Sequence, residues 1–486
     1  MSALYDNAAL RALERRAQHL AGIDETTLMR RAGLAAWRCV LREFAGPRRL
    51  LVLCGPGNNG GDGWVLALHA LQSGLDVCAV HLPEHSPRTV LATRMAEEYR
   101  AAGGRIDVFS GTLPAADVIV DAIFGIGLNR APDAASSELI AKANAAGVPI
   151  LALDVPSGAN AERGDVPGQA IVAQHTVQFI AAHAGLYTGA ARDRAGALSL
   201  ATLDVPAACF DGLVPLARLQ AKPSLPPRPL DSHKGRFGHG LVIGGDAGMG
   251  GAALLASEAA LRSGIGLISV ATRAAHLPAF IARRPEAMAH AADDLATMPA
   301  LIAAADAVAI GPGLGQGDWA RQLLAGVAES HKPCVIDADA LNLFAAAPFA
   351  LPPQAVLTPH PGEAARLLGS DVAGIQSDRF AAANTLAERH RCSVILKGSG
   401  TIITAPGRSA RVLGNGNPGM ASGGMGDALT GVVLALLARG FAAFEAAAIG
   451  AWLHGDAGDR AANAGQAGLL ATDLIEQLRA AQAECR

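Results

Sequence analysis

The segment with the clearest chemical potential is NGNPGMASGGMGDALTGVVLALL, residues 415–437. Gly423, Gly424 and Gly426 open a long apolar stretch that predicts a helix, and Asp427 falls in its first turn. Free N–H groups and the helix dipole make such a start a binding site for an anion. A carboxylate beside that site can deprotonate a hydroxyl that attacks a phosphate. The density of glycine favours this interpretation over a helix start that Gly and Asp only cap.

Further glycines and polar residues follow other predicted strands in the same half. They are Gly244, Gly245, Gly248, Gly250 and Gly251 in one turn, GPGLG at 311–315, Asp337 and Asp339, His360 between two prolines, and KGSGT at 397–401. No GK[ST] sequence follows the first of these glycines, so they do not form a Walker A loop. The cation of Lys397 beside flexible backbone is consistent with phosphate or adenine binding. A hydrogen-bonded loop histidine is the alternative for His360.

A second glycine-rich turn lies in RLLVLCGPGNNGGDGWVLALHAL, residues 49–71. Gly55, Gly57 and Gly60 match the GxGxxG pattern of dinucleotide-binding folds, with phosphate expected at the helix start. The strand at 77–82 does not end in the acidic residue that usually holds a ribose hydroxyl, and His81 stands near that point. A tight turn capped by Asn or Asp explains the glycines equally well.

Oxygen-bearing side chains also follow two later strands of the first half. Asp121 precedes a Gly-rich loop, and Asp154 and Ser157 lie in LALDVPSGAN. An isolated Asp after a strand is usually a cap, but several such strand ends in one sheet can converge on a single ligand. With the polar stretch 58–62, they predict a site for a cation or a sugar-bearing ligand.

Short apolar runs alternate with amphipathic stretches in both halves, which is typical of parallel α/β folds. The predicted strands are 49–54, 77–82, 118–124, 149–156 and 176–181, then 240–245, 267–272, 307–313, 333–339, 355–360 and 393–398. Predicted helices of the second half are 252–263, 363–368, 378–390 and 426–438. Charged residues interrupt the apolar stretch 429–453, which therefore predicts a buried helix pair rather than a membrane span.

Residues 215–230 carry five Pro and are the best candidate for a linker. We therefore expect domains at 1–215 and 230–486, joined by a Pro-rich linker at 216–229. A chain of 486 residues exceeds what one hydrophobic core usually organises.

Composition excludes several classes of protein. Apolar residues make up 51% of the chain and charged residues 17%, which is typical of packed globular proteins. A net charge of -3 argues against a nucleic-acid partner. The seven cysteines form no CxxC pair and indicate free thiols in a reducing compartment. The N-terminus lacks the pattern of a signal peptide, so we expect a cytoplasmic protein that does not bind membranes.

The motifs GPGNNGGDG, DAIFGIG and LDVPSG, preceded by LMRRAG, resemble the NAD(P)H-hydrate epimerase family across about the first two hundred residues. The resemblance implies a Rossmann-like three-layer sandwich. It implies that the hydrated nucleotide contacts Asn58, Asn59, Gly60, Gly61, Asp62, Gly125, Ile126, Gly127, Leu128, Asn129, Arg130, Ala131 and Asp154. It also implies potassium ligands at Asn59, Asp121 and Ser157. Asp154 touches the substrate in this comparison, and we expect it to be the general acid and base.

The second half resembles the ribokinase-like superfamily and, within it, the ADP/ATP-dependent NAD(P)H-hydrate dehydratases. HKGRFGHGLVIGG, GMGGAALLAS, GPGLG, DADALN, TPHPGE, LKGSGT and NGNPGMASGGMGDALTG occur in the family order over about 230–486. The resemblance implies a ribokinase-like α/β domain. Its implied hydrate contacts are Ala252 (or its neighbour Ala253), Gly313, His360 and Asp427, and its implied nucleotide contacts are Lys397, Gly398, Ser399, Gly400, Thr401 and Gly426.

Together the resemblances imply one repair function. Hydration places a hydroxyl on C6 of the nicotinamide ring of NADH or NADPH. The first half would interconvert the R and S epimers. In the second half, Asp427 would activate the hydroxyl of the S form to attack ADP or ATP carried with magnesium, and loss of phosphate would restore NAD(P)H. We expect a homo-oligomer.

Two other functions fit parts of the pattern. A small-alcohol kinase, such as a hydroxymethylpyrimidine or thiazole kinase, shares the GGMGD-type anion site but releases a stable phosphorylated product. A non-catalytic nucleotide-binding module would keep the epimerase-like fold. Such a module has no need of Asn59, Asp121, Asp154 and Ser157 together, which argues against it.

Overall fold

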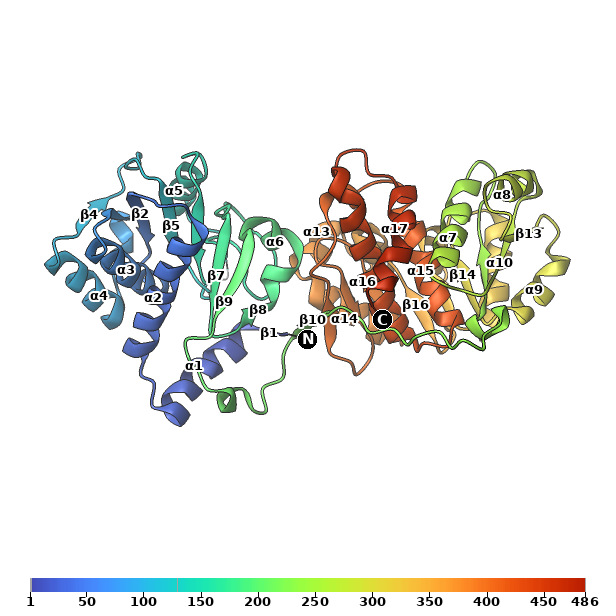
Figure 1. Ribbon diagram of the computed structural model, residues 1–486, viewed down its shortest axis with the longest axis horizontal. Helices are drawn as coiled ribbons and strands as arrows, with labels where there is room; N and C mark the ends of the chain where they lie inside the picture. Colours follow the sequence, from blue (N-terminus) through green and yellow to red (C-terminus); the bar gives the residue numbers. More distant parts are fainter. Residues whose placement is uncertain (1, 129, 486) are drawn as a thin grey trace. The chain divides into compact units, whose positions relative to one another are not determined.

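The computed structural model describes residues 2–128 and 130–485. These residues form two compact units that divide between Ala217 and Arg218 (Figure 1). The Pro-rich segment begins at this division. Within it, Leu225 is buried in the core of the second unit and its N–H donates to the carbonyl of Cys485. This part of the segment is therefore held by the second unit.

The first unit is built on a parallel sheet with the strand order β4-β3-β2-β5-β6-β7-β9. Its strands are β2 (Arg49–Cys54), β3 (Asp76–His81), β4 (Arg105–Val108), β5 (Val118–Ala122), β6 (Ile150–Leu153), β7 (His175–Phe179) and β9 (Ala197–Ala201). Two short strands, β1 (Ala3–Tyr5) and β8 (Ala182–His183), pair with each other in parallel. A further short strand, β10 (Ala217–Leu219), lies at the division and has two of its three residues in the second unit.

Helices cover both faces of this sheet. They are α1 (Asn7–Ala21), α2 (Glu25–Glu43), α3 (Asn58–Gln72), α4 (Val90–Ala101), α5 (Ala134–Asn144) and α6 (Gly189–Ala195). Along β2, Leu50 and Val52 pack into a core with α1 to α4, whereas Leu51 and Leu53 pack into a second core with α5. This alternation follows from the two-residue period of a strand, and it gives the expected three layers (Figure 1).

The sequence ends α1 and begins α2 within a few residues. Gly22 closes α1 in the left-handed conformation, with φ of 64°, which glycine adopts without strain. Asp24 then caps α2 by accepting a hydrogen bond from the N–H of Thr27. The two helices are thereby fixed beside the sheet, where they contribute to the site described below.

The second unit holds a mixed sheet with the strand order β13-β12-β11-β14-β15-β16-β17-β18-β19. Its strands are β11 (His239–Ile243), β12 (Leu267–Thr272), β13 (Met288–Ala291), β14 (Ala307–Ile310), β15 (Cys334–Ile336), β16 (Ala355–Leu357), β17 (Ser393–Leu396), β18 (Ile402–Thr404) and β19 (Ala410–Val412). Strands β11 to β17 pair in parallel, whereas β18 and β19 pair antiparallel to their neighbours. The α/β class predicted for both halves is confirmed, with an antiparallel edge that was not predicted.

Helices of the second unit are α7 (Gly250–Arg262), α8 (Leu277–Arg283), α9 (Met298–Ala304), α10 (Asp318–Glu329), α11 (Ala338–Ala346), α12 (Pro361–Leu368), α13 (Val372–Ser377), α14 (Arg379–His390), α15 (Met425–Ala438), α16 (Ala443–Ala461) and α17 (Ala471–Ala483). Helices α7, α15, α16 and α17 share one core with the sheet. The helix pair predicted over 429–453 is confirmed as α15 and α16, both largely buried. Within the described chain, no helix has both the length and the apolar character to cross a membrane.

Each sheet reverses its strand order at one point. The chain moves outward from β2 to β4 and then restarts at β5 on the other side of β2; in the second unit it restarts at β14 beside β11. Ligands of open α/β sheets bind beyond the carboxyl ends of the strands at such a reversal. The glycine-rich turn after β2 and that after β11 both lie at these positions.

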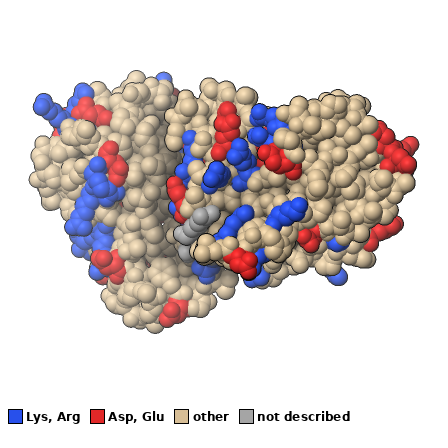
Figure 2. Space-filling view, turned by 45° about the vertical axis from the view of Figure 1, so that its right-hand side comes forward, with Lys and Arg blue, Asp and Glu red and all other residues tan. Residues whose placement is uncertain are grey.

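The surface and the cysteines agree with the composition. All seven cysteines are buried and free. Basic and acidic side chains are interspersed over the face of the described residues in Figure 2, without a broad basic area.

Candidate active sites

A cavity of about 710 Å³ lies at the strand reversal of the first unit. Predicted residues in its lining are Asn58, Asn59, Asp62, Gly125, Ile126, Gly127, Leu128, Arg130 and Asp154. The loops after β2 and β5 therefore meet around one space, as the resemblance implies. The predicted contact Asn129 lies outside the described residues.

Three predicted contacts, Gly60, Gly61 and Ala131, are not part of the described lining. A side chain on Gly60 would strike the carbonyl of Gly55, and one on Gly61 would strike the side chain of Met29. These two glycines let α3 pack closely against the turn and against α2. In the structure these glycines support the site through the packing of α3 and do not line the cavity.

The carboxylate of Asp154 is held at the cavity by an unusual backbone and by a neighbouring ring. Its φ is 66°, in the left-handed region, while its N–H donates to the carbonyl of Val177 at 2.8 Å. Non-glycine residues in this region cost about 1–3 kcal/mol and cluster at functional sites. Its Oδ1 lies 2.6 Å from Nε2 of His183, a fully buried residue of β8 that also lines the cavity.

Gly125 allows Asp154 to meet Asn59. A side chain on Gly125 would begin 3.1 Å from Oδ2 of Asp154 and 3.5 Å from the Asn59 side chain. Because glycine leaves this space open, the acid and the amide share one corner of the cavity. The predicted convergence of these two strand ends is thus present in the structure.

Two more carboxylic acids line the cavity near Asp154. Burial, followed by the negative charge of Asp154, raises the pKa of Asp62 well above its usual range and raises the pKa of Glu14. Both groups are therefore inclined to hold a proton. Glu14 comes from α1, and Arg11, Gln18 and Glu25 of the first two helices join it in the lining.

Asp121 and Ser157 form a compact buried unit beside this corner. The N–H and Oγ of Ser157 donate to the Asp121 carboxylate at 2.7 and 2.6 Å. Burial raises the pKa of Asp121 to about 6 in spite of these bonds. The loop that continues to Gly125 is attached here, since the N–H of Phe124 donates to Ser157 Oγ at 2.8 Å.

The Asn59 amide supports a cation at this point. Its nitrogen and oxygen are both buried and have no hydrogen-bond partner among the described residues. A buried carboxylate and an unpaired amide oxygen are stabilised when a cation is present. The residues Asn59, Asp121 and Ser157 therefore offer oxygen ligands of the kind that a cation binds.

The second site surrounds the start of α15. Gly424 precedes the helix with φ of 86°, and Asp427 lies in the first turn. Burial, followed by the charge of Asp337, raises the pKa of Asp427 to about 6, against the opposing effect of Lys397. A carboxyl of this strength is a competent base near neutral pH.

Lys397 forms ion pairs with two carboxylates of the protein at this site. Its Nζ lies 2.9 Å from Oδ1 of Asp337 and 3.7 Å from Glu363, and Thr430 donates to the other oxygen of Asp337 at 2.8 Å. A side chain on Gly426 would begin 3.3 Å from the Lys397 amine. The ammonium thus stands directly behind the glycine amides of the predicted anion site.

The rest of KGSGT is a turn between β17 and β18. Gly398 has φ of 139° and its carbonyl accepts a hydrogen bond from Thr401 Oγ1 at 3.0 Å. Gly398 and Ser399 are exposed, whereas Gly400 is buried. The exposed turn follows Lys397 directly, so the predicted nucleotide contacts adjoin the start of α15 through that lysine.

Ala252 and Gly313 lie against each other across the strand reversal of the second unit. A side chain on Gly313, whose φ is 57°, would begin 3.1 Å from Cβ of Ala252. Ala252 is half-buried, whereas Ala253 is fully buried in the core. Of the two neighbours, only Ala252 lies where a ligand at this reversal can touch it.

His360 has a structural task as well as its predicted one. It caps α12, since its Nδ1 accepts from the N–H of Gly362 at 3.0 Å and its own N–H donates to Glu363 at 2.8 Å. Its ring is half exposed. The structure therefore contains the hydrogen-bonded histidine that was the alternative for His360. The exposed edge of its ring is still available to a ligand.

Sequence reasoning missed His183, Glu14, Thr430 and His454. Burial lowers the pKa of His454 to about 4, so its neutral ring donates through Nε2 to the carbonyl of Met425 at 2.9 Å and steadies the start of α15. His454 lies in an Ala-rich helical stretch with no polar pattern that indicates a site. Only the tertiary fold brings it to Met425.

Comparison with known proteins agrees with this geometry. A family profile described as NAD(P)H-hydrate dehydratase matches residues 240–480, and one described as YjeF-related protein N-terminus matches residues 25–185. The chain is 45% identical to the bifunctional NAD(P)H-hydrate repair enzyme of Coxiella burnetii, over 99% of each chain. It is 42% identical to that of Escherichia coli, over 97% of this chain and 92% of the relative.

Solved structures resemble the second unit. The ADP/ATP-dependent NAD(P)H-hydrate dehydratase of Bacillus subtilis, co-crystallised with ATP and Mg²⁺, has a TM-score of 0.51 and 30% identity. The match covers 56% of this chain and 99% of that one. Both resemblances proposed from the motifs are confirmed, and the chain belongs to the family of bifunctional NAD(P)H-hydrate repair enzymes.

Proposed function

We propose that the first unit interconverts the C6 epimers of hydrated NADH and NADPH and that the second unit dehydrates the S epimer with ADP or ATP. The observation that carries this proposal is the pair of carboxyl groups, Asp154 and Asp427, each at the ligand-binding edge of its own sheet. Two sites for one damaged cofactor give a coherent sequence, because a stereospecific dehydratase can use only one epimer.

In the first site, Asp154 protonates the C6 hydroxyl, and the bond between C6 and oxygen breaks as electrons move in from the ring nitrogen. The ring becomes a planar cation and one water is released. Water then adds to either face and returns its proton to Asp154. The hydrogen bond from His183 holds the carboxylate toward the ring.

Asn59, Asp121 and Ser157 would hold potassium in this site. The cation would supply positive charge beside the buried carboxylate and would help to order the loop that begins at Phe124. This role rests on the unpaired amide of Asn59 and on the raised pKa of Asp121.

In the second site, Asp427 accepts the proton of the C6 hydroxyl while the oxygen attacks the terminal phosphate of the nucleotide. Phosphate then leaves from C6 as electrons move in from the ring nitrogen, and loss of a proton from C5 restores the C5–C6 double bond of the dihydronicotinamide. The products are NAD(P)H, inorganic phosphate, a proton, and ADP from ATP or AMP from ADP. The amides at Gly424 and Gly426 face the developing charge. Magnesium bound with the nucleotide supplies further positive charge.

Substrate contacts follow the predicted residues. We assign Ala252, Gly313 and His360 to the hydrate, and the turn Gly398–Thr401 with Lys397 to the nucleotide. The enzyme is expected to act in the cytoplasm as a homo-oligomer without nucleic-acid or membrane partners.

One experiment tests the whole proposal. The purified chain is mixed with both hydrate epimers, ATP or ADP, and magnesium, and recovery of dihydronicotinamide absorbance is followed beside inorganic phosphate. Wild type should recover both epimers, whereas Asp154→Asn should stop once the S form is consumed, apart from the slow spontaneous exchange. Asp427→Asn should still interconvert the epimers but recover none. A stable phosphorylated product would instead support a small-alcohol kinase.

A further inference from the structure

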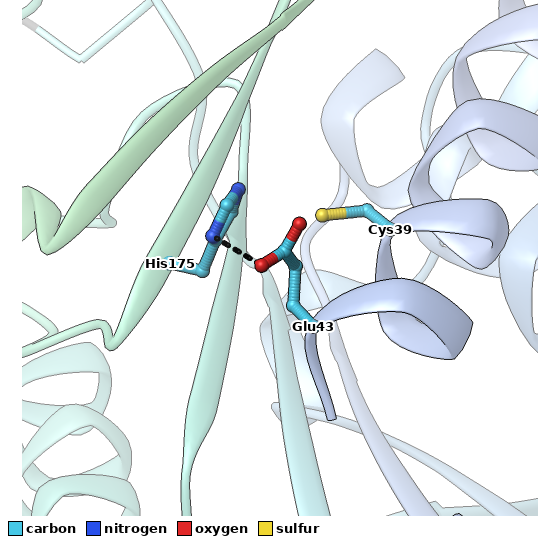
Figure 3. A group of neighbouring side chains, drawn as sticks. All are labelled: Cys39, Glu43 and His175. Carbon is cyan, nitrogen blue, oxygen red and sulfur yellow. Dashed lines mark ion pairs between the residues drawn. The ribbon is translucent and has the colours of Figure 1, made fainter. Parts of the chain in front are cut away.

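A second group of reactive side chains lies away from the cavity. Cys39 and Glu43 are one turn apart at the C-terminal end of α2, and His175 is the first residue of β7 (Figure 3). The cavity lies beyond the carboxyl ends of the strands, so a residue at the start of β7 belongs to the opposite edge of the sheet. The proposed epimerase chemistry makes no use of this cluster.

The three side chains supply ligand atoms of the types that zinc prefers. A thiol sulfur, a carboxylate oxygen and an imidazole nitrogen all lie within 4.8 Å of one another. Ligand atoms of a tetrahedral zinc site lie roughly 3.5 Å apart, so closure needs about one ångström of side-chain movement. In Figure 3 the Cys39 sulfur and the His175 ring approach the Glu43 carboxylate from opposite sides. We propose that Cys39, Glu43 and His175 bind one divalent metal ion of the zinc class.

The histidine is already oriented for this role. Its Nδ1 faces the Glu43 carboxylate at 3.7 Å, while its Nε2 lies 2.8 Å from Oγ of Ser199 on β9. Metal-bound histidines almost always hydrogen-bond through their second ring nitrogen, which fixes the ring. Ser199 is therefore the outer-shell partner of the proposed ligand His175.

An ion can reach the cluster from solvent. The Cys39 and His175 side chains are buried, whereas the Glu43 side chain is 32% exposed. The carboxylate thus forms the outer wall, and a water molecule can complete the four positions that zinc usually fills. Buried ligands behind one exposed ligand meet the requirements of an enterable site with a defined second shell.

Arg42 competes with the proposed ion. Its Nε lies 2.5 Å from Oε1 of Glu43, and its guanidinium reaches to 3.9 Å from the Cys39 sulfur. The Arg42 side chain is 60% exposed and is free to turn toward solvent when a metal ion enters. Removal of the Arg42 guanidinium should therefore strengthen metal binding. This result distinguishes a metal site from a structural ion pair.

The proposed ion would attach α2 to β7. The opposite part of α2 supplies Glu25, Leu28 and Met29 to the cavity. Metal binding at Cys39 and Glu43 would therefore stabilise the helix that forms one wall of the nucleotide site. The effect expected is on stability, because the cluster does not touch the cavity.

Cobalt binding to the full chain, after treatment with a chelator, tests the proposal. Thiolate-bound Co²⁺ gives a charge-transfer absorption that oxygen-only sites do not give, so the band reports on this cluster whether or not the repair activity is present. We expect one cobalt per chain, displaced by zinc, and a higher Tm when metal is bound. Cys39→Ser and His175→Gln should lose the band, whereas the control Cys78→Ser, another buried free thiol, should keep it.

Three milder variants guard against loss of folding. Glu43→Gln changes a partly exposed side chain and should weaken the affinity by about tenfold or more, and Ser199→Ala should weaken it roughly tenfold. Arg42→Ala should bind cobalt more tightly than wild type. No thiolate band in the wild type, or a band that survives Cys39→Ser but not Cys78→Ser, would overturn the proposal. Unchanged affinity in Glu43→Gln would remove the carboxylate from the ligand set.

Discussion

The imidazole Nε2 of His183 lies 2.6 Å from the Asp154 carboxylate, and the other ring nitrogen has no hydrogen-bond partner in the described part of the chain. The ring is fully buried behind the acid, and both residues line the cavity. His183 therefore has one polar contact to make, and that contact orients Asp154. We assign it as a positioning residue for the acid.

His183→Leu should lower the kcat of epimer interconversion roughly thirtyfold, since a carboxylate that loses its buried partner is disfavoured by about 2 kcal/mol. KM should change little, because the buried ring makes its hydrogen bond to Asp154 rather than to the ligand. His183→Gln keeps an N–H donor and should recover most of the rate. If the leucine and glutamine variants were equally impaired, the hydrogen bond would not be the cause.

Gly125 and Gly127 offer a matched pair of substitutions in one loop. A methyl group on Gly125 would begin 3.1 Å from Asp154 Oδ2, whereas one on Gly127 meets nothing within 4 Å. Small displacements of a catalytic group can reduce rates strongly, so Gly125→Ala should lower epimerisation by roughly tenfold. Gly127→Ala leaves Asp154 in place but adds a methyl group to the cavity lining, so its effect should fall on KM rather than on kcat. The two rates, with Tm for both variants, separate crowding of the acid from general damage to the loop.

Potassium should stabilise the first unit through Asp121. Burial raises the pKa of Asp121 from 3.8 to about 6. When the pKa of an acid is higher in the folded protein than in the unfolded one, the folded protein loses stability as the pH rises from the lower to the higher value. For Asp121 this loss is complete above about pH 6. It amounts to roughly 3 kcal/mol. In potassium-free buffer at pH 7, Asp121→Asn should therefore melt at a higher temperature than wild type.

Added potassium should reverse that order, since a cation offsets the buried charge of wild type and has little to offset in Asp121→Asn. Thermal melts in potassium and in tetramethylammonium chloride at equal ionic strength measure the difference. Equal melting shifts in both salts, or in both proteins, would contradict a cation site at Asn59, Asp121 and Ser157.

The pH dependence of dehydration should report on Asp427. Its pKa is raised to about 6, and the base is active only when ionised, so kcat/KM should fall about tenfold per pH unit below that value. Asp337 contributes to the rise. Asp337→Asn should therefore move the acid limb of the profile to lower pH while the Thr430 contact is kept by the amide. An acid limb that stays in place would show that another group limits the rate.

Much of the fold follows from local pattern. β2 was predicted at its observed bounds because six apolar or basic residues precede a glycine turn, and β3, β5, β6 and β7 differ from prediction by a few residues. β4 and β9 were missed because RIDV and ALSLA are short and partly exposed, with no apolar run. β18 and β19 were missed for the same reason of length.

The sites were predictable where their residues follow strands. Asn59, Asp154 and Asp427 come directly after strands or at a helix start, and sheet topology carries such positions to one edge. His183 and Glu14 belong to elements whose place beside the site depends on tertiary packing, so no local pattern marks them. The ion pair between Lys397 and Asp337 was also not predicted, because the two residues are sixty positions apart and two strands, β16 and β17, lie between them.

The carboxylates around Lys397 have a consequence for how the nucleotide enters. Asp337, Glu363 and Asp427 act on its ammonium, Asp339 acts on Asp427, and Arg366 acts on Glu363, so the acids of this network outnumber its cations. A bare polyphosphate would meet these acids as well as the glycine amides at the start of α15, whereas its magnesium complex would carry less negative charge. Magnesium bound to the phosphates would therefore reduce the repulsion between the nucleotide and these acids while the nucleotide enters the site.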